Sequence, residues 1–380
     1  MNKKGTSKNF WTSLPRPFFV LAPMANVTDA AFRSVIAKYG KPDVTWTEFV
    51  SADGLMSAGR DKLLVDLRFT KAERPIVAQL FTGHPEAMRG AASLVAELGF
   101  DGLDINMGCP DRAVEKQGGG AGMIKTPEMA VAVIRAAQEG VRQGQGKKVT
   151  GKKKKEQGEA QGIPVTVKTR IGYNKVDMKW LEMLILLKLP ALTVHLRTRK
   201  EMSDVPAHWE LMPEIVALRD RLQADIPAEG RTLIIGNGDV MSVEEARVKV
   251  AASGCDGVMI GRGIFGTPWL FRDVVIPVKT GIQDHATNSN NILDPHFRGD
   301  DIVTGLSKIP TPQERLRVLL EHTLLFEKKF KGIKNFAVMK KHFKAYVSGW
   351  EGAKELRAHL METNSAKEVK KILKIHLLSM

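Results

Sequence analysis

Residues 104–110 read Asp-Ile-Asn-Met-Gly-Cys-Pro and close an apolar run that begins at Gly102. Such a run is typical of a buried strand, and Gly108 and Pro110 favour a turn that lifts the side chain of Cys109 out of the core. A cysteine in this place is either a reactive thiol that serves as acid, base or nucleophile, or a small buried hydrophobic residue. The rest of the chain decides between these two interpretations.

Eight short apolar runs of this kind recur through the first 263 residues, most of them separated by segments with helical periodicity. They are nearly continuous in apolar residues, as parallel strands buried on both faces are. Helices are predicted between them, for example at 85–98 and 127–141, each opening with a proline that suits a first helical turn. The pattern predicts an α/β fold of the (β/α)8 TIM-barrel type. The predicted strands are residues 18–24, 44–50, 75–81, 102–108, 164–170, 191–197, 232–239 and 257–263.

Polar residues of these runs fall at the carboxyl ends, where barrel enzymes gather their chemistry. Random placement would scatter them over both ends, so the shared polarity predicts one composite site. Cys109 belongs to this set, which favours the reactive thiol over the buried hydrophobic residue. The strand-end residues are Met24, Glu48, Gln79, Asn106 with Cys109, Lys168 with Arg170, His195 with Arg197, Asn237 with Asp239, and Gly261 with Arg262.

Two glycine-rich turns end the seventh and eighth runs, Gly-Asn-Gly-Asp at 236–239 and Gly-Arg-Gly at 261–263. Barrels commonly bind phosphate there, because glycine lets backbone amides approach closely and an arginine such as Arg262 adds charge. We therefore expect a phosphorylated cofactor within the barrel. Lys168 would hold negative charge on a reduced ring or on a substrate phosphate, unless it forms an ordinary ion pair at the strand end.

The sequence supports neither a metal site nor a hydrolase. The nine histidines and two cysteines do not group with zinc-like spacing, so no metal is expected. No Gly-x-Ser-x-Gly elbow joins a strand to a helix, which argues against hydrolase chemistry.

The 380-residue chain is 43% apolar and carries a formal charge of +15, so it can bury a large core and one smaller domain. Six lysines lie between positions 147 and 155, and residues 312–380 hold fifteen Lys and Arg against seven Asp and Glu. Segregated positive charge favours a polyanion such as nucleic acid, although a solubilising surface has the same composition.

The domain organisation follows from these shifts in composition. Residues 1–272 are predicted to form the barrel, with a lysine-rich disordered insertion at 144–162 on the amino-end face. Residues 273–311 show no sustained periodicity and are interpreted as a linker or insertion. Residues 312–380 repeat apolar residues at helical spacing, which predicts a small helical bundle.

One segment of this bundle has two distinct faces. Phe336, Phe343 and Val347 are predicted to face its core, while Lys340, Lys341 and Lys344 project outward. Aromatic residues at this spacing are more often core residues than platforms for base stacking.

Cys109 and Cys255 are too few for a disulfide framework, and the first ten residues lack the apolar stretch of a secretory signal. No run approaches the roughly 18 apolar residues of a membrane span. We expect a cytoplasmic monomer without membrane association.

The chain resembles the tRNA-dihydrouridine synthase family along nearly its whole length apart from the two insertions. An ordered set of motifs carries the resemblance. The motifs are Ala22-Pro23-Met24-Ala25, Asp104 to Pro110, Val165-Thr166-Val167-Lys168, His195-Leu196-Arg197-Thr198-Arg199, Asn237-Gly238-Asp239, Gly261-Arg262 and Lys340-Lys341-His342.

The resemblance implies an FMN-bound barrel and a helical tRNA-binding domain that includes Lys340 and Lys341. Such enzymes reduce the C5=C6 bond of particular tRNA uridines with NADPH as the usual donor, by hydride transfer from flavin N5 to C6. Cys109 matches the proton donor to C5, and Asn106 and Arg197 would hold the base. The base must be flipped out of the folded tRNA. The positions that match flavin contacts are Pro23, Met24, Ala25, Gln79, Lys168, His195, Asn237, Gly238, Asp239, Gly261 and Arg262.

Two alternatives stay open at this point. An FMN barrel of the dihydroorotate dehydrogenase type also pairs an Asn with a Cys-Pro near the fourth strand, but it would not need the basic helical part. The second alternative is a tRNA-binding folding factor with a vestigial flavin site. The presence of Cys109, Lys168 and His195 together argues against it, because such a protein would not need them.

Overall fold

The structure is a computed structural model that describes three stretches of the chain, residues 9–146, 162–272 and 309–379. The lysine run at 147–155 and residues 273–308 lie outside the described residues, so the roles predicted for the two insertions stay predictions.

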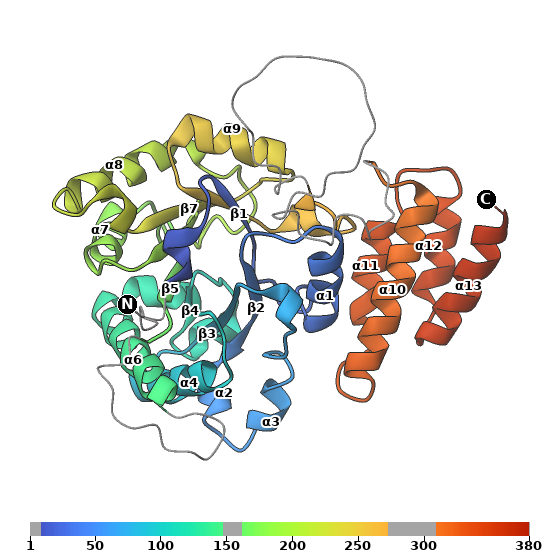
Figure 1. Ribbon diagram of the computed structural model, residues 1–380, viewed down its shortest axis with the longest axis horizontal. Helices are drawn as coiled ribbons and strands as arrows, with labels where there is room; N and C mark the ends of the chain where they lie inside the picture. The colour runs from blue at the N-terminus through green and yellow to red at the C-terminus, as the bar shows by residue number, and fades with distance from the viewer. Residues whose placement is uncertain (1–8, 147–161, 273–308, 380) are drawn as a thin grey trace, which may run out of the picture. The chain divides into compact units, whose positions relative to one another are not determined.

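Eight parallel strands follow one another in the order β1-β8-β7-β6-β5-β4-β3-β2 (Figure 1). A parallel bridge between Val20 and Val44 joins β1 to β2 and completes the ring. The predicted TIM barrel is confirmed. The strands are β1 (Phe18–Leu21), β2 (Thr45–Ser51), β3 (Ile76–Phe81), β4 (Gly102–Met107), β5 (Val165–Arg170), β6 (Ala191–His195), β7 (Leu233–Asn237) and β8 (Gly257–Ile260).

Each predicted run contains a strand, but several strands end earlier than predicted. β1 ends at Leu21, before Pro23, which has no N–H to donate to a ladder. β7 ends at Asn237 because Gly238 (φ +131) and Asp239 (φ 54) leave the extended conformation. The residues beyond the strand ends form loops at the carboxyl-end face.

Helices follow the strands along the chain, as the pattern predicts. They are α1 (Ala30–Tyr39), α2 (Ala52–Leu55), α3 (Arg60–Leu63), α4 (Pro85–Glu97), α5 (Arg112–Lys116), α6 (Pro127–Gly146), α7 (Met178–Leu186), α8 (Met212–Leu222) and α9 (Val243–Ser253).

Helix α6 is longer than predicted and packs closely on α4. A Cβ at Gly140 would lie 2.2 Å from the Arg89 carbonyl oxygen, and one at Gly144 would lie 2.2 Å from that of Ser93. Both glycines thus let the two helices touch. The prediction of a disordered insertion from 144 is therefore wrong for 144–146, which belong to α6.

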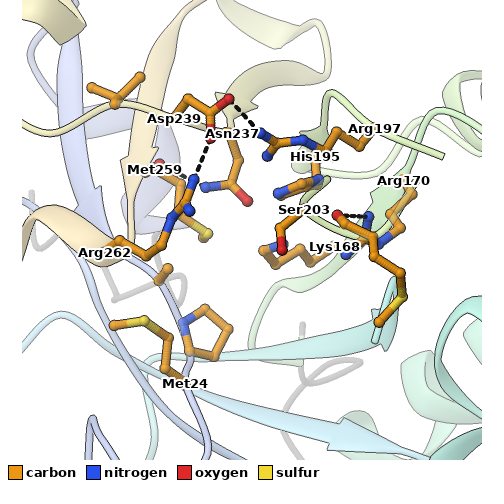
Figure 2. A pocket seen from close by; sticks show the side chains of 16 residues that line it. Met24, Lys168, Arg170, His195, Arg197, Ser203, Asn237, Asp239, Met259 and Arg262 are labelled. Carbon is orange, nitrogen blue, oxygen red and sulfur yellow. Dashed lines mark hydrogen bonds and ion pairs between the residues drawn. The ribbon is translucent and has the colours of Figure 1, made fainter. Parts of the chain in front are cut away.

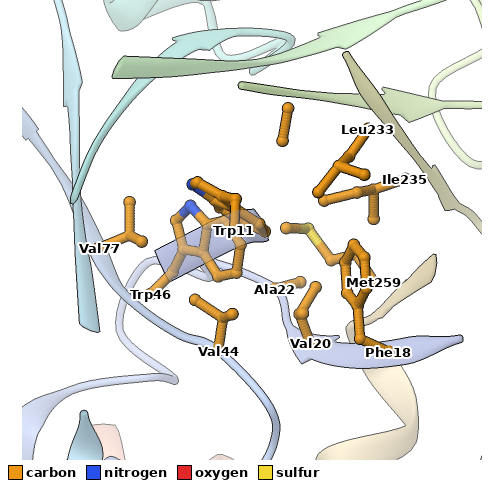
Figure 3. Close-up of a cluster of buried hydrophobic side chains, with 11 residues drawn as sticks. Trp11, Phe18, Val20, Ala22, Val44, Trp46, Val77, Leu233, Ile235 and Met259 are labelled. Carbon is orange, nitrogen blue, oxygen red and sulfur yellow. The ribbon is translucent and has the colours of Figure 1, made fainter. Parts of the chain in front are cut away.

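Apolar side chains fill the barrel interior at its amino end (Figure 3). Trp11, on the 3-10 helix η1 (Phe10–Ser13), is 2% exposed, and its ring centroid lies 5.8 Å from that of Trp46. A Cβ at Gly102, the first residue of β4, would lie 3.4 Å from the Phe10 ring, which places η1 at the amino end. The barrel is therefore a packed core there rather than a pore.

The described chain forms two compact units. The first takes residues up to 34 and 42–264, and the second takes residues 35–41 and those from 265 on. The second unit contains α10 (Pro312–Phe330), α11 (Val338–Tyr346), α12 (Ala353–Met361) and α13 (Ala366–Ser379).

The helical unit has the predicted apolar core. Helix α10 begins with a capping box, in which Thr311 and Glu314 each bond the other's backbone N–H, followed by Pro312 in the first turn. Phe343 and Val347 are fully buried, as predicted, while Phe336 is half-buried. Among the described residues, no helix combines the length and apolar character needed to cross a bilayer.

Candidate active site at the carboxyl end of the barrel

A pocket of about 260 Å³ opens at the carboxyl ends of β1, β5, β6, β7 and β8 (Figure 2). Most predicted site residues meet there although they are far apart in sequence. The lining residues are Ala22, Pro23, Met24, Lys168, Arg170, His195, Arg197, Met202, Ser203, Asn237, Gly238, Asp239, Val240, Met259, Gly261 and Arg262.

The wall formed by β5 and β6 carries two half-buried basic groups, Lys168 and His195. Burial, and then the charge of Arg170, lowers the pKa of Lys168 to about 8, against the opposite effect of Asp104. Burial also lowers the pKa of His195 well below its usual value, so the imidazole is neutral near pH 7. Within the described chain, Nδ1 of His195 is buried without a hydrogen-bond partner. This wall therefore presents a cation and an unused imidazole nitrogen.

Asp239, in the loop after β7, bridges two arginines of the pocket. Its carboxylate accepts hydrogen bonds from Arg197 and Arg262, and also from the Ala207 backbone N–H at 2.8 Å. Burial alone would raise the pKa of Asp239, but the Arg197 hydrogen bond and the other partners outweigh it and lower the pKa. The side chain of Arg197 is 3% exposed and that of Arg262 is 58% exposed, so Arg262 lies at the rim.

Glycine at position 238 is required by the backbone. Its φ is +131°, and a Cβ there would lie 2.7 Å from the Ala207 Cβ. Trp209 Nε1 donates to the Gly238 carbonyl at 2.8 Å, and Asn237 Nδ2 donates to that of Met259 at 2.8 Å. The ends of β7 and β8 are thus tied together where the sequence predicts a phosphate site.

Cys109 follows β4 and lies within electrostatic range of Lys168 and Arg170. Its side chain is half-buried, and burial is the largest of the causes that raise the pKa of its thiol. The thiol is therefore protonated near neutral pH and has a proton to give. Cys255, by contrast, is buried on the approach to β8.

Backbone contacts seat the loop that carries Cys109. Ala121 donates its N–H to the Cys109 carbonyl at 2.9 Å, and Arg199 Nη2 donates to that of Pro110 at 3.2 Å. Arg170 donates from Nε to Gly108 O at 2.8 Å and from Nη1 to Thr198 O at 2.9 Å. Arg170 therefore joins the loop after β4 to the loop after β6.

Several predicted residues lie outside the pocket lining, and Cys109 is one of them. Gln79 and Asn106, from β3 and β4, are buried beside it and hydrogen-bond to each other at 3.1 Å. Ala25 is exposed on the turn after β1. Lys340 and Lys341 belong to α11, where Lys341 is exposed and Lys340 half-buried.

The structure adds site residues that had no predicted role. The sequence placed Arg170 only at a strand end. Its position two residues after Lys168 could have predicted that it lines the same pocket, because alternate residues of a strand share a face. Met202 and Ser203 come from an irregular loop after β6, which has no periodicity to reveal it. In the described ranges no group of three or more His, Cys, Asp or Glu side chains is placed to hold a metal ion.

Comparison with known proteins gives one family. A sequence model described as Dihydrouridine synthase (Dus) matches residues 20–380. "Probable tRNA-dihydrouridine synthase 2" of Bacillus subtilis (strain 168) is 38% identical over 370 residues, which is 97% of this chain and 96% of that protein. "Probable tRNA-dihydrouridine synthase" of Staphylococcus aureus (strain COL) is 36% identical over 370 residues, 96% of this chain and 95% of that protein.

The similar solved structures have lower sequence identity to this chain than these relatives have. Morphinone reductase superposes with a TM-score of 0.45 at 13% identity, over 69% of this chain and 86% of that one. Histamine dehydrogenase from Rhizobium sp. 4-9 superposes with a TM-score of 0.45 at 13% identity, over 67% and 45%.

Proposed function

The chain belongs to the dihydrouridine synthase family, and from this premise we propose that it reduces the C5=C6 bond of specific uridines in tRNA, with FMN as flavin and NADPH as electron donor. The observation that carries the proposal is the half-buried thiol of Cys109 at the carboxyl end of the barrel, within electrostatic range of the half-buried Lys168 and with its pKa raised by burial. A thiol and a cation in this arrangement suit the protonation of a carbanion that forms on a pyrimidine ring.

The pocket has the chemistry that FMN requires. The unpartnered Nδ1 of His195 is a buried polar atom in its wall, and Arg262 supplies a cation at the rim. Glycine backbone at positions 238 and 261 lines the pocket, as phosphate binding requires. Reduced FMN, when bound, supplies the hydride that adds to C6. The residues proposed to hold it are Pro23, Met24, Ala25, Gln79, Lys168, His195, Asn237, Gly238, Asp239, Gly261 and Arg262.

Cys109 gives its proton to C5 as negative charge develops there. Burial favours the protonated thiol before the reaction. Lys168, whose pKa lies at about 8, is largely cationic near pH 7 and stabilises negative charge beside the reacting ring. Asn106 and Arg197 are proposed to hold the base, with Arg197 kept in place by Asp239 and by the Val205 carbonyl, to which its Nε donates at 2.5 Å.

The remaining chain fits a polynucleotide substrate. A uridine inside folded tRNA reaches a pocket in a barrel only when its base is flipped outward. Residues 312–380, with fifteen Lys and Arg against seven Asp and Glu, would grip the tRNA backbone through side chains such as Lys340 and Lys341. Residues 1–272 would form the catalytic domain, and residues 273–311 would connect the two.

The test is nucleoside mass spectrometry of unmodified tRNA incubated with the purified protein and NADPH. A gain of two hydrogens on uridine is expected, and Cys109→Ala should slow it by about 10²-fold or more while the protein keeps its flavin. Cys255→Ala is the matched control, because Cys255 precedes β8 and its thiol is buried at the amino end of the barrel. Unchanged turnover in Cys109→Ala would refute the proton-donor role, and turnover of free dihydroorotate instead of tRNA would favour the small-pyrimidine alternative.

A further inference from the structure

Asp104 is a fully buried carboxylate that the proposed chemistry does not use. It lies on β4, opposite Gln79 of β3 and Thr166 of β5 in the register of the sheet. Its Oδ2 accepts a hydrogen bond from Gln79 Nε2 at 2.7 Å, and its Oδ1 accepts one from the Thr166 hydroxyl at 2.6 Å. A charge in such a place is costly to bury, which calls for a compensating role.

Two side-chain amides continue the chain of hydrogen bonds from Asp104 to Cys109. Gln79 Oε1 accepts from Asn106 Nδ2 at 3.1 Å. Asn106 Oδ1 then accepts from the backbone N–H groups of Cys109 at 2.9 Å and Gly108 at 3.1 Å. Gln79 is 0% and Asn106 6% exposed, so water does not readily replace these partners.

The donors and acceptors in this chain can be ordered in one way only. An ionised carboxylate accepts hydrogen bonds and cannot donate, so Gln79 must turn its NH2 toward Asp104 and its oxygen toward Asn106. Asn106 must then turn its NH2 toward Gln79 and its oxygen toward the Cys109 N–H, which can only donate. Each amide is thereby held in one of its two flip states from both ends.

We propose that Asp104 is a positioning residue for Cys109. Asp104 sets the amide orientations of Gln79 and Asn106, and these in turn fix the position of the Cys109 backbone. We call the three side chains of Asp104, Gln79 and Asn106 the amide relay. The inference that this placement matters for turnover rests on the proposed function, in which Cys109 delivers the proton.

The charge state of Asp104 is consistent with this role. Burial raises its pKa to about 6, against the hydrogen bonds from Gln79 and Thr166 and the charge of Lys168. Asp104 is therefore mostly an acceptor at pH 7.5. Other contacts hold the carbonyl groups of the loop, such as the bond from Ala121 N to Cys109 O, whereas the relay holds its N–H groups.

Asp104→Leu removes the acceptor at the origin of the relay and keeps the same branching of heavy atoms. The NH2 group of Gln79 would lose its partner, so Gln79 and Asn106 would no longer be held in one flip state from that end. The Cys109 loop would be anchored less firmly. The double variant Asp104→Asn with Gln79→Glu moves the carboxylate one link along and restores every donor and acceptor pair.

The experiment measures alkylation of Cys109 by iodoacetamide at pH 7.5, with peptide mass spectrometry and the buried Cys255 of the same molecule as reference. In Asp104→Leu the Cys109 rate should rise several-fold, and in the double variant the rate should stay within about twofold of the parent. Turnover of Asp104→Leu on tRNA should fall about 100-fold in kcat with little change in KM. The double variant is judged on alkylation alone, since the carboxylate that it introduces at position 79 would lie beside the proposed flavin site.

Asp101→Asn is the matched control. Asp101 precedes β4 and bonds Arg74 and the Ile76 backbone N–H, at the opposite end of the barrel, so its loss should leave Cys109 alkylation unchanged.

Two results would overturn the relay. One is a folded Asp104→Leu protein with parental Cys109 alkylation and kcat; the other is a double variant whose Cys109 is alkylated as fast as in Asp104→Leu. If Asp104→Leu does not fold, the double variant should still fold, and its failure would count against the relay. Altered alkylation in Asp104→Leu, together with unchanged turnover in Cys109→Ala, would keep the relay and refute the proposed function instead.

Discussion

Gly120 is the residue on which the seating of Cys109 depends most directly. It adopts φ +58°, and a Cβ there would lie 2.6 Å from the Cys109 carbonyl oxygen and 2.8 Å from Val114 Cγ1. The N–H of the next residue, Ala121, donates to that same carbonyl. No periodicity or motif spacing reveals such a contact, because it depends on how the chain returns after α5.

Gly120→Ala should therefore damage the site beyond the usual cost of a side chain at positive φ. We expect the barrel to lose more than the ~1–2 kcal/mol typical of that backbone cost, and uridine reduction to slow by about tenfold or more. Thermal unfolding and single-turnover kinetics would measure the two effects. Gly99→Ala is the control, since Gly99 has φ +80° and its Cβ would meet only Arg74 Nη2 at 3.8 Å. Equal losses in both variants would contradict the assigned role of Gly120.

At the scale of elements, α10 and α11 enclose a pair of histidines. His322 and His342 are both fully buried, with ring centroids 4.6 Å apart in an edge-to-face arrangement. Burial lowers the pKa of His322 well below its usual value, with a further contribution from His342. Burial, with the charge of Lys341, lowers the pKa of His342 to about 3.

The helical unit should consequently lose stability in acid. Both histidines bind protons below pH 6.5 once the unit unfolds, but they stay neutral while it is folded. The free energy of unfolding therefore has its full value above pH 6.5 and falls as pH drops toward 3. For two protons, the slope of this free energy against pH should approach about 2.7 kcal/mol per pH unit. Hydrogen–deuterium exchange of α10 and α11 peptides, corrected for intrinsic rates, would measure it.

His322→Phe should reduce that slope by about half, whereas His359→Gln, at an exposed position of α12, should leave it unchanged. A parental slope in His322→Phe would show that other groups cause the acid sensitivity.

At the scale of the whole molecule, positive charge is concentrated in the part of the chain predicted to bind tRNA. Lys341 and Lys344 are exposed on α11, whose opposite face buries Met339, Phe343 and Tyr346. An exposed lysine that contacts a phosphate displaces a counterion, so its loss weakens binding and reduces the salt dependence. The candidate catalytic groups thus belong to the barrel, and the candidate phosphate contacts belong to the helical unit.

Lys341→Glu should weaken tRNA binding and lower the slope of log Kd against log salt by about one unit. Filter binding across a range of KCl concentrations would measure both. Lys179→Glu, the same change of charge at an exposed position of α7, should have a much smaller effect. Equal slopes in parent and Lys341→Glu would refute the proposed contact, and flavin absorbance would confirm that the barrel is intact.

Sequence alone determined the barrel and most of its pocket, because strand runs and strand-end polarity depend on local composition. Lys168, His195 and Asp239 could be placed at one face, since parallel strands all end on the same side. Strand ends were less certain, because Gly238 and Asp239 leave the strand through backbone conformation rather than through a change in hydrophobicity.

Only the tertiary structure decided the partners of these residues. Asp104, Gln79 and Thr166 meet through the register of β3, β4 and β5, although 25 residues separate Gln79 from Asp104 and 62 separate Asp104 from Thr166. Arg170 and Gly120 likewise act through contacts with the Cys109 loop that no local pattern encodes. Hydrophobic periodicity states which face of a strand is buried, whereas hydrogen-bond partners depend on how strands far apart in the chain align.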